Sequence, residues 1–263
     1  MQYIPENKNR ADEGDLRICG YMKVNKNKLP LITVVTVVFN AANTIEDAIV
    51  SVTTQSYSNC EYIVIDGGST DGTLDVIIRY GHAIDYYVSE PDEGIYHAMN
   101  KALKLASGEW LVFLGADDVM TDCLMRVAGQ LKCPDSIYYG NVKLLSSENL
   151  YDGPFNRYKL MQQNICHQSI FYPYSVYKVK NYDERCRFLA DYKYNMELWG
   201  GGTPFVFISE TVAIFNDNGI SSLANEDFQE IKMSLILSEL GIFFWITKKM
   251  RNFLVCLVKG RLK

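Results

Sequence analysis

The 263-residue chain lacks the features that mark several common protein classes. Its seven cysteines include no Cys-x-x-Cys pair, which argues against a zinc site or a disulfide framework and fits a reducing compartment. The net charge of −5 gives no basic footprint for nucleic acid. The N-terminal stretch up to Pro30 contains no apolar core of the kind that a signal peptide needs. Neither a Gly-x-Gly-x-x-Gly fingerprint nor a P-loop is present, which disfavours a nicotinamide cofactor and a Walker-type phosphate grip.

Short apolar runs alternate with stretches of helical spacing in the first half of the chain. Apolar residues make up 48% of the sequence, enough for the core of one large α/β domain. Strands are predicted at 31–39, 61–65, 85–89 and 109–114, and helices at 45–54, at 74–80 and through 98–106 up to Gly108. This alternation predicts a parallel sheet with right-handed crossover connections. The preceding polar segment, residues 1–29, is expected to be a loosely ordered extension.

Polar side chains follow the predicted strands at their carboxyl ends, where open parallel sheets bind ligands. They are Asn40, Asp66, the segment 89–93, and the pair Asp117 and Asp118. The aspartate pair follows the fully apolar run 110–114. Adjacent carboxylates at the end of a buried strand repel each other and are costly to desolvate, and a divalent cation removes that penalty. The pair therefore predicts a metal site, with a helix N-cap as the structural alternative.

The second half of the chain has a weaker pattern. Strands are predicted at 137–142, on the far side of the metal site, and at 169–172, with a polar loop at 146–163 between them. A helix is predicted over 189–199, and a closing strand or hairpin over 205–215. This helix carries Asp191 in its first turn.

The tail from residue 228 combines aliphatic and aromatic clusters with lysine and arginine. Glu239 and the Lys-Lys-Met-Arg run at 248–251 deny it the length of a transmembrane span. Apolar stretches among basic residues suit an interfacial helix on an anionic membrane surface. An amphipathic helix packed on the domain is the alternative. The tail therefore predicts either peripheral membrane contact or a structural role.

Four segments of the first half together resemble a known family. They lie at 37–40, 61–73, 89–100 and 115–118. In order and spacing they are similar to the nucleotide-binding half of a family 2 glycosyltransferase with the GT-A fold, over residues 31–124. Within that family the chain most resembles enzymes of bacterial polysaccharide, O-antigen and colanic-acid assembly. The resemblance weakens after Leu124 and returns at 167–168 and 189–192.

This resemblance implies an α/β GT-A domain over 30–227, with a Rossmann-like, mostly parallel sheet flanked by helices. The nucleotide-binding half would be 30–124 and the acceptor half 125–227, followed by the amphipathic basic tail 228–263. The implied activity is an inverting transfer of a sugar from a nucleotide diphosphate donor, preferably a UDP-sugar, to a hydroxyl of a growing glycan. We expect the acceptor to be a polyprenyl-linked bacterial surface glycan, and the enzyme to be cytoplasmic, at the inner face of the cytoplasmic membrane.

The resemblance also implies a set of donor-binding residues. Asp66 matches the aspartate that accepts a hydrogen bond from the imide N–H of uracil, and His167 is the candidate for contacting the diphosphate or the metal. The full set is Val38, Phe39, Asn40, Asp66, Ser69, Glu90, Asp92, Gly94, Asn100, Ala116, Asp117 and His167. Structural alternatives are a loop-forming role for Asp66 and Ser69 and a core position for Phe39.

The metal motif of the family is usually written Asp-x-Asp, and this sequence departs from it. The first position of the motif is Gly115 or Ala116, so only Asp117 and Asp118 can supply carboxylates. We expect this pair to hold Mg²⁺ or Mn²⁺, with the direct ligand left open between the two.

An inverting transfer needs a base on the acceptor side, away from the diphosphate, where the metal carboxylates do not lie. The acidic residues of the second half are therefore the candidates: Asp152, Asp183, Glu184, Asp191, Glu197, Glu210 and Asp217. Asp191 emerges from an apolar segment at the start of a helix, and it matches the catalytic acid position of the family. We expect Asp191 to be the base, with a first-turn helix role as the structural alternative.

Two other classes share parts of this pattern. A nucleotidyltransferase that makes nucleotide sugars also has a parallel sheet and a metal carboxylate, but it normally has a basic, Gly-rich phosphate loop after the first strand. Here residues 40–43 contain no lysine or arginine, which disfavours that class. A non-catalytic nucleotide- or sugar-binding module would not need Asp191.

Overall fold

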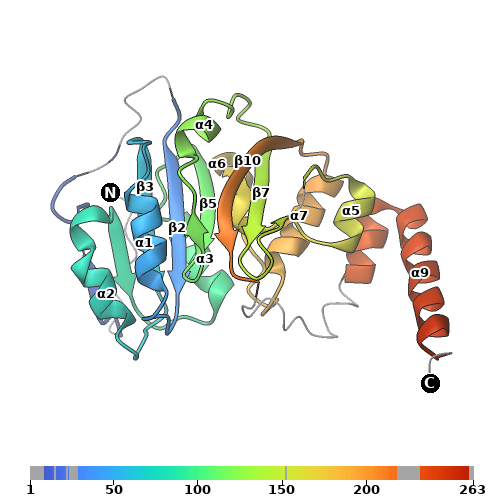
Figure 1. Cartoon of the computed structure of the whole chain (residues 1–263), viewed down its shortest axis with the longest axis horizontal. Helices are drawn as coiled ribbons and strands as arrows, with labels where there is room; N and C mark the ends of the chain where they lie inside the picture. The colour runs from blue at the N-terminus through green and yellow to red at the C-terminus, as the bar shows by residue number, and fades with distance from the viewer. Residues whose placement is uncertain are drawn as a thin grey trace.

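A mixed ten-stranded sheet runs through the protein in the computed structural model (Figure 1). The structure describes residues 9–14, 16–21, 23, 29–151, 153–217 and 232–260, without the side chains of 252–260. The strands are β1 (Asp12–Gly14), β2 (Ile32–Val38), β3 (Cys60–Asp66), β4 (Tyr86–Ser89), β5 (Trp110–Gly115), β6 (Val119–Met120), β7 (Ile137–Leu144), β8 (Leu150–Tyr151), β9 (Ile170–Pro173) and β10 (Phe205–Phe215). Their order across the sheet is β1-β4-β3-β2-β5-β9-β7-β10-β6, with β8 paired to β7.

Four neighbouring strands, β4, β3, β2 and β5, are parallel, as the sequence predicts. Val38 at the end of β2 lies level with Asp66 of β3, which lies level with Ser89 of β4. On the other side, Val37 lies level with Gly115 of β5. The strand ends that carry the polar loops therefore meet at one edge of the sheet, which is the ligand-binding edge of open α/β sheets.

The two faces of the sheet bury separate apolar clusters, because side chains alternate along each strand. In β2, Val35 belongs to one cluster and Val34 to the other. Helices α1 (Ile45–Thr53), α2 (Thr73–Arg79) and α4 (Leu124–Ala128) cover the face of Val34. Helices α3 (Ile95–Leu103) and α7 (Ala190–Gly200) cover the face of Val35. Figure 1 shows α1 and α2 on the near side of the strands.

The second half extends the sheet beyond β5. Strands β7 and β10 are parallel to each other. The short strand β9, antiparallel to both β5 and β7, connects this pair to the sheet of the first half. Residues 205–215 form the single strand β10, so the hairpin alternative is wrong. A shifted register against β7 between Phe207 and Ala213 explains the break in its apolar pattern. The segment 146–163, expected to be a loop, contains β8 and helix α5 (Arg157–Gln162), whose N-cap side chain is Asn156.

The N-terminal segment contributes more structure than expected. Strand β1 is an edge strand, antiparallel to β4. Arg17 is 5% exposed, pairs with the buried carboxylate of Glu61 and donates a hydrogen bond to the carbonyl of Leu105. Removing one partner of such a buried pair is strongly destabilising, so the pair anchors this part of the chain. The expectation of a loose extension is therefore wrong for the described residues.

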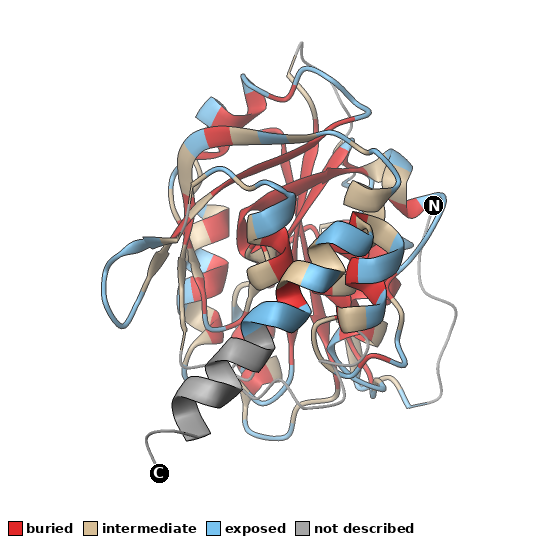
Figure 2. Cartoon of the chain, turned by 90° about the vertical axis from the view of Figure 1, so that its right-hand side faces the viewer, coloured by how far each residue is buried: buried red, intermediate tan, exposed pale blue. Residues whose placement is uncertain are grey.

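The described part of the tail is helical and packs on the acceptor half. Its expected boundary at residue 228 lies outside the described residues. A helical turn from Lys232 leads into the π-helical turn η4 (Ile236–Leu240) and then α9 (Ile242–Gly260). Turn η4 packs against α7, and α9 packs against α5. Figure 2 shows α9 with much of its described surface exposed. No helix in the described ranges is both long and apolar enough to cross a membrane.

Candidate active site

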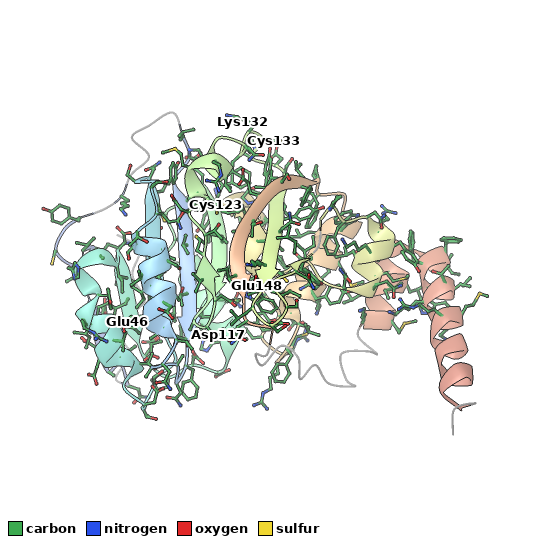
Figure 3. The ribbon with its side chains drawn as sticks, viewed as in Figure 1. Glu46, Asp117, Cys123, Lys132, Cys133 and Glu148 are labelled. Carbon is green, nitrogen blue, oxygen red and sulfur yellow. The ribbon has the colours of Figure 1, made fainter. Side chains whose placement is uncertain are left out.

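The aspartate pair lies where the chain leaves β5, and Figure 3 shows Asp117 near the lower edge of the sheet. Asp117 is exposed, whereas Asp118 is 2% exposed and the intervening turn residue Ala116 is 9% exposed. A Cβ atom at Gly115 would collide with Oδ2 of Asp118 and lie 3.1 Å from Oδ1 of Asp117. Both carboxylates therefore occupy the space into which a side chain at position 115 would project. A larger side chain at position 115 would therefore displace one or both carboxylates.

Two residues from the second half hold Asp118. Gln168 donates from Nε2 to Oδ2 at 2.7 Å, and the backbone N–H of Asn216 donates to Oδ1 at 2.8 Å. The side chain of Asn216 also donates to Asp117 at 3.1 Å. Burial, with a smaller effect of the neighbouring Asp117 charge, raises the pKa of Asp118. Strand β6 follows the pair directly, so the interpretation of the pair as a helix N-cap is wrong.

These contacts are compatible with a divalent cation at the pair. Both carboxylates lie against Gly115, and Asp117 is open to solvent. Mg²⁺ is usually held by one or two carboxylates together with water and substrate phosphates. In the part of the chain that the structure describes, no group of three or more His, Cys, Asp and Glu side chains could hold a metal ion. The pair therefore fits a cation shared with a substrate better than an enclosed metal centre.

Asp66 is buried at the end of β3 and holds the loop that follows. Its carboxylate accepts from the hydroxyls of Ser69 and Ser89 and from the N–H of Ser69, at 3.1 and 3.3 Å from the two oxygens. These four contacts use the roughly four acceptor positions of an ionised carboxylate, and the N–H of Ser69 shares two of them. The loop-forming role is therefore present, and a ligand N–H would have to replace one of the two shared contacts.

The residues after β2 are locked to the same loop. Asn40 has a left-handed backbone with φ of 51°, its N–H donates to Oγ of Ser69, and its Oδ1 accepts from the N–H of Thr70. Val38 is buried, whereas Phe39 is 62% exposed, so the core alternative for Phe39 is wrong. An exposed ring at the ligand edge is free to stack on a planar group.

Two of the expected donor-binding residues have structural partners. Glu90 is 2% exposed, and its carboxylate pairs with Lys101 at 2.9 Å and with Arg10 at 3.1 Å. Asn100 is buried, and its amide group donates to and accepts from the backbone of Tyr182. Their contacts account for Glu90 and Asn100 without a ligand.

The turn at Asp92 and Gly94 lies against the Asp66 loop. Asp92 accepts from the N–H of Gly94 at 2.8 Å, and a Cβ at Gly67 would lie 2.5 Å from its Oδ2. Burial raises the pKa of Asp92. Gly94 has φ of 124°, a conformation that favours glycine, and it begins α3 with open space around it. These two residues are thus placed with Asp66 at the ligand edge.

Asp191 lies in the first turn of α7, after Leu189, whose φ of 60° is left-handed. It is 5% exposed, yet both oxygens have partners. Tyr96 donates its hydroxyl to Oδ1 at 2.7 Å, Asn164 donates from Nδ2 to Oδ2 at 2.6 Å, and Nδ1 of His167 is 3.7 Å from Oδ2. Burial alone would raise the pKa of Asp191, but the contacts with His167 and Tyr96 outweigh it and hold the pKa below its usual value.

His167 links Asp191 to the aspartate pair. It begins the turn η2 (His167–Ser169), in which Gln168 holds Asp118. Burial lowers the pKa of His167, but the charges of Asp191, Asp118 and Asp117 together raise it overall. The imidazole therefore lies within electrostatic reach of all three carboxylates. The two halves of the chain contribute to one site.

The other acidic residues considered as bases have different partners. Asp183 pairs with Arg185 and Lys193, Glu184 with Asn100, Glu197 with Lys180, Glu210 with Arg126 and Asp217 with Ser146. The two cations beside Asp183 lower its pKa. Asp152 lies outside the described residues. Among the described candidates, only Asp191 contacts His167.

Four residues of the site were not expected from the sequence: Gln168, Asn216, Tyr96 and Asn164. Asn216 had a usable signal, because it is a polar residue at the end of a strand, β10, as Asp66 is at the end of β3. Tyr96 and Asn164 had none, since their contacts with Asp191 span 95 and 27 positions of the chain.

The site combines a carboxylate pair at the ligand edge with a buried aspartate that contacts His167. A group-transfer enzyme with an anionic donor requires groups of these kinds. The family model described as Glycosyl transferase family 2 matches residues 33–189. The chain belongs to this family and is a glycosyltransferase.

Individual proteins agree with this assignment. The chain is 31% identical over 223 residues to the PGL/p-HBAD biosynthesis glycosyltransferase of Mycobacterium bovis, covering 81% of this chain and 87% of the relative. It is 32% identical over 123 residues to WfgD of Escherichia coli, a UDP-Glc:alpha-D-GlcNAc-diphosphoundecaprenol beta-1,3-glucosyltransferase, covering 46% and 49%. The structure of S. aureus TarS 1-349 with UDP-GlcNAc has a TM-score of 0.64 at 18% identity, over 79% of this chain and 67% of TarS 1-349. This chain spans 40% of the longer TarS chain. That likeness identifies the fold as GT-A.

Proposed function

We propose that the enzyme is a metal-dependent, inverting glycosyltransferase that moves a sugar from a UDP-sugar to a hydroxyl of a lipid-linked bacterial surface glycan. One observation carries the proposal: Asp191 contacts His167, while the adjacent Gln168 holds Asp118. These contacts support a role for one carboxylate with the acceptor and for two with the donor. The relatives support the substrate class, since WfgD is named for UDP-Glc and a diphosphoundecaprenol acceptor and TarS was solved with UDP-GlcNAc.

Asp117 and Asp118 would hold Mg²⁺ or Mn²⁺. When bound, the cation neutralises charge that develops on the departing diphosphate. The protein keeps both carboxylates in place through Gly115, Gln168 and Asn216. Because the last two come from the acceptor half, that half also shapes the donor site.

Asp191 takes the proton of the acceptor hydroxyl as its oxygen attacks the anomeric carbon. The new C–O bond forms on the face opposite the diphosphate. The bond between the sugar and the diphosphate breaks with its electron pair leaving on UDP, so the configuration inverts. Tyr96 occupies one acceptor position on Oδ1 of Asp191, whereas Asn164 and His167 both contact Oδ2, so Oδ1 is the oxygen that takes the proton. The lowered pKa keeps Asp191 ionised and therefore basic at neutral pH despite its burial.

The nucleotide base is placed over the ends of β2 and β3. Asp66 accepts the imide N–H of uracil in place of one of the two contacts that it shares with the N–H of Ser69, and the exposed ring of Phe39 stacks on the base. Asn40, Ser69 and Asp92 hold the loops that form this pocket. A uracil preference follows because guanine presents a different hydrogen-bonding edge.

The exposed side of α9 supports a place at a membrane surface. Ile242, Phe243, Ile246 and Met250 are 45–69% exposed and share one side of the helix by their spacing. Apolar side chains next to lysine and arginine suit the interface of an anionic leaflet. We place this face on the inner surface of the cytoplasmic membrane, where a polyprenyl-linked acceptor would be presented.

The test is a panel of UDP- and GDP-sugars, each incubated with the full chain, Mn²⁺ and a polyprenyl-diphosphate sugar acceptor. Transfer of sugar with release of UDP supports the proposal. Release of pyrophosphate from a nucleoside triphosphate and a sugar phosphate would identify a nucleotidyltransferase instead. Nucleotide binding without turnover of any donor would identify a non-catalytic module.

A further inference from the structure

Two buried lysines lie together on the acceptor half, between α5 and the helical tail. Lys232 is 6% exposed and Lys248 is 9% exposed. Nζ of Lys232 donates to the backbone carbonyl of Gln162 at 3.1 Å, and Nζ of Lys248 donates to Oε1 of the same residue at 3.2 Å. Two ammonium groups therefore share one glutamine at the end of α5.

These lysines differ from the other buried cations. Arg17 and Lys101 are similarly buried, and each pairs with a buried glutamate. Among the residues that the structure describes, no carboxylate lies within 4.0 Å of Nζ of Lys232 or of Lys248. Lys232 instead lies over the ring of Tyr192, at 4.5 Å from its centre. A buried charge without a counter-ion is costly, and two of them repel each other.

The electrostatics of the pair agree with this description. Burial and the charges of Lys248 and Arg251 lower the pKa of Lys232 to about 8. Burial and the charge of Arg251 also lower the pKa of Lys248. Arg251 is exposed and lies three residues after Lys248 on α9, so it lies on the same side of the helix as Lys248.

A third donor belongs to the same cluster. Nε2 of Gln162 is buried and has no hydrogen-bond partner among the residues that the structure describes. Capping of the α5 carbonyl by Lys232 is a structural explanation for one of the lysines. It does not account for Lys248 or for the unpaired amide. Two ammonium groups with no described carboxylate beside them, together with this amide N–H, instead match what a phosphate group requires, because its oxygens accept several charge-assisted hydrogen bonds.

The position of the cluster relates it to the acceptor side of the active site. Gln162 precedes Asn164, which holds Asp191, by two residues, and Tyr192 follows Asp191 directly. Lys248 lies on the buried side of α9, opposite the exposed apolar residues of the same helix. The cluster therefore lies on the inner side of α9, near the helix α7 that carries the proposed base.

We propose that Lys232, Lys248 and the amide of Gln162 form a binding site for the diphosphate of a lipid-linked acceptor. The assignment to an acceptor rests on the proposed function, whereas the anion site follows from the cluster itself. Arg251 guides the diphosphate in from solvent, and the apolar side of α9 lies in the lipid that carries it.

The experiment measures the binding of farnesyl diphosphate to the full chain by calorimetry, with farnesol and inorganic pyrophosphate as comparison ligands. Lys232→Met and Lys232→Met/Lys248→Met should weaken farnesyl diphosphate binding by about tenfold or more, since charge-assisted hydrogen bonds are lost. Lys249→Met is the matched control, because Lys249 is the exposed neighbour on α9 and stacks on Trp245 at 4.0 Å. It should bind within about twofold of the wild type, as expected for an exposed charge screened by salt. Lys232→Arg keeps the charge and should retain most of the affinity.

Each alternative outcome has a defined meaning. Equal affinity of wild type and both Met variants, with all proteins folded by circular dichroism, overturns the site. Equal binding of pyrophosphate and farnesyl diphosphate assigns the site to free anions and overturns the lipid-linked acceptor. Binding to vesicles of phosphatidylglycerol and of phosphatidylcholine is measured as well. If the Met variants lose only binding to phosphatidylglycerol vesicles, the site binds bulk lipid headgroups, and the lipid-linked acceptor is again overturned. UDP binding is measured in parallel: normal UDP binding with unchanged farnesyl diphosphate binding in the variants removes only this inference. If the wild type does not bind UDP, but the Met variants lose farnesyl diphosphate binding as predicted, the proposed function is overturned and the anion site remains.

Discussion

The hydroxyl of Tyr96 donates a hydrogen bond to Oδ1 of Asp191 at 2.7 Å, across 95 positions of the chain. Tyr96 lies in the first turn of α3, directly after the turn at Asp92 and Gly94, whereas Asp191 belongs to the acceptor half. This bond therefore ties the proposed base to the turn that lies against the Asp66 loop. Removing one donor from a buried carboxylate both loosens it and raises its pKa.

Tyr96→Phe tests that relationship. We expect kcat to fall by roughly tenfold, from the loss of about 1–2 kcal/mol of hydrogen bonding, with UDP affinity unchanged. Because the pKa of Asp191 is held low in the folded protein, loss of this donor should move the acid limb of kcat/KM to higher pH. Tyr182→Phe is the matched control, since its ring packs 5.6 Å from that of Tyr96 and its hydroxyl contacts Tyr177. An effect of equal size in both variants would attribute the loss to packing.

Asp118→Asn tests the metal site. It should lower kcat by roughly a hundredfold or more, the scale seen when a group that stabilises transition-state charge is removed, and an excess of chelator should do the same to the wild type. Burial raises the pKa of Asp118, so its ionised form opposes folding near neutral pH when no cation is present. The variant should therefore be at least as stable as the wild type in chelator, and it should lose the rise in Tm that Mn²⁺ and UDP give.

Asp122→Asn is the control for the metal site. Asp122 is an exposed aspartate that accepts a hydrogen bond from Ser56, and this variant should keep full activity. Full activity of the wild type in chelator would contradict the metal proposal.

Asp66→Asn tests the base pocket. An amide keeps the size of the carboxylate, but it presents a donor where the imide N–H of uracil needs an acceptor. UDP binding measured by calorimetry should weaken by roughly 1–3 kcal/mol, while GDP binding, already weak, should change little. Because Asp66 also holds Ser69 and Ser89, the fold of the variant is checked by its Tm. Unchanged UDP affinity in a folded variant would reduce Asp66 to its loop-forming role.

Lys232→Met makes a separate prediction about stability. The pKa of Lys232 is lowered to about 8 from its ordinary value of 10.5, so the charged form opposes folding below that pKa. Stability of the wild type should consequently rise as pH increases from about 8 towards 10.5, as this lysine loses its proton. At neutral pH the variant should be more stable by roughly 1–3 kcal/mol, and the advantage should shrink in alkaline solution. Denaturant titrations of both proteins at several pH values measure this, and a less stable variant would show that Lys232 serves mainly as the cap of α5.

The sequence predicts the first half of the fold well, because its elements follow local rules. The apolar run of β5 and the β-branched run of β2 each specify a buried strand, and parallel pairing brings their polar ends to one edge. The sequence does not show that Phe39 is exposed and Asp118 is buried, because the burial of a loop residue depends on what packs against the loop.

The second half is harder to predict because its structure depends on distant contacts. Helix α5 was missed since it spans only six residues, and β1 was missed because its pairing with β4 lies 75 residues away. Glu90 was expected to bind the donor because it follows a strand. Its partners, Arg10 and Lys101, come from an edge segment and a helix that the local pattern does not connect to it.

The most direct test of the account is Asp191→Asn. The substitution keeps the shape and the contact with Tyr96 but removes the basicity. Steady-state kinetics with a UDP-sugar and a polyprenyl-linked acceptor should show kcat lowered by roughly 10²–10⁴-fold, the range for loss of a general base, with UDP affinity and Tm close to the wild type. A variant that turns over at nearly the wild-type rate would contradict the assignment of Asp191 as the base, and with it the mechanism proposed for this site.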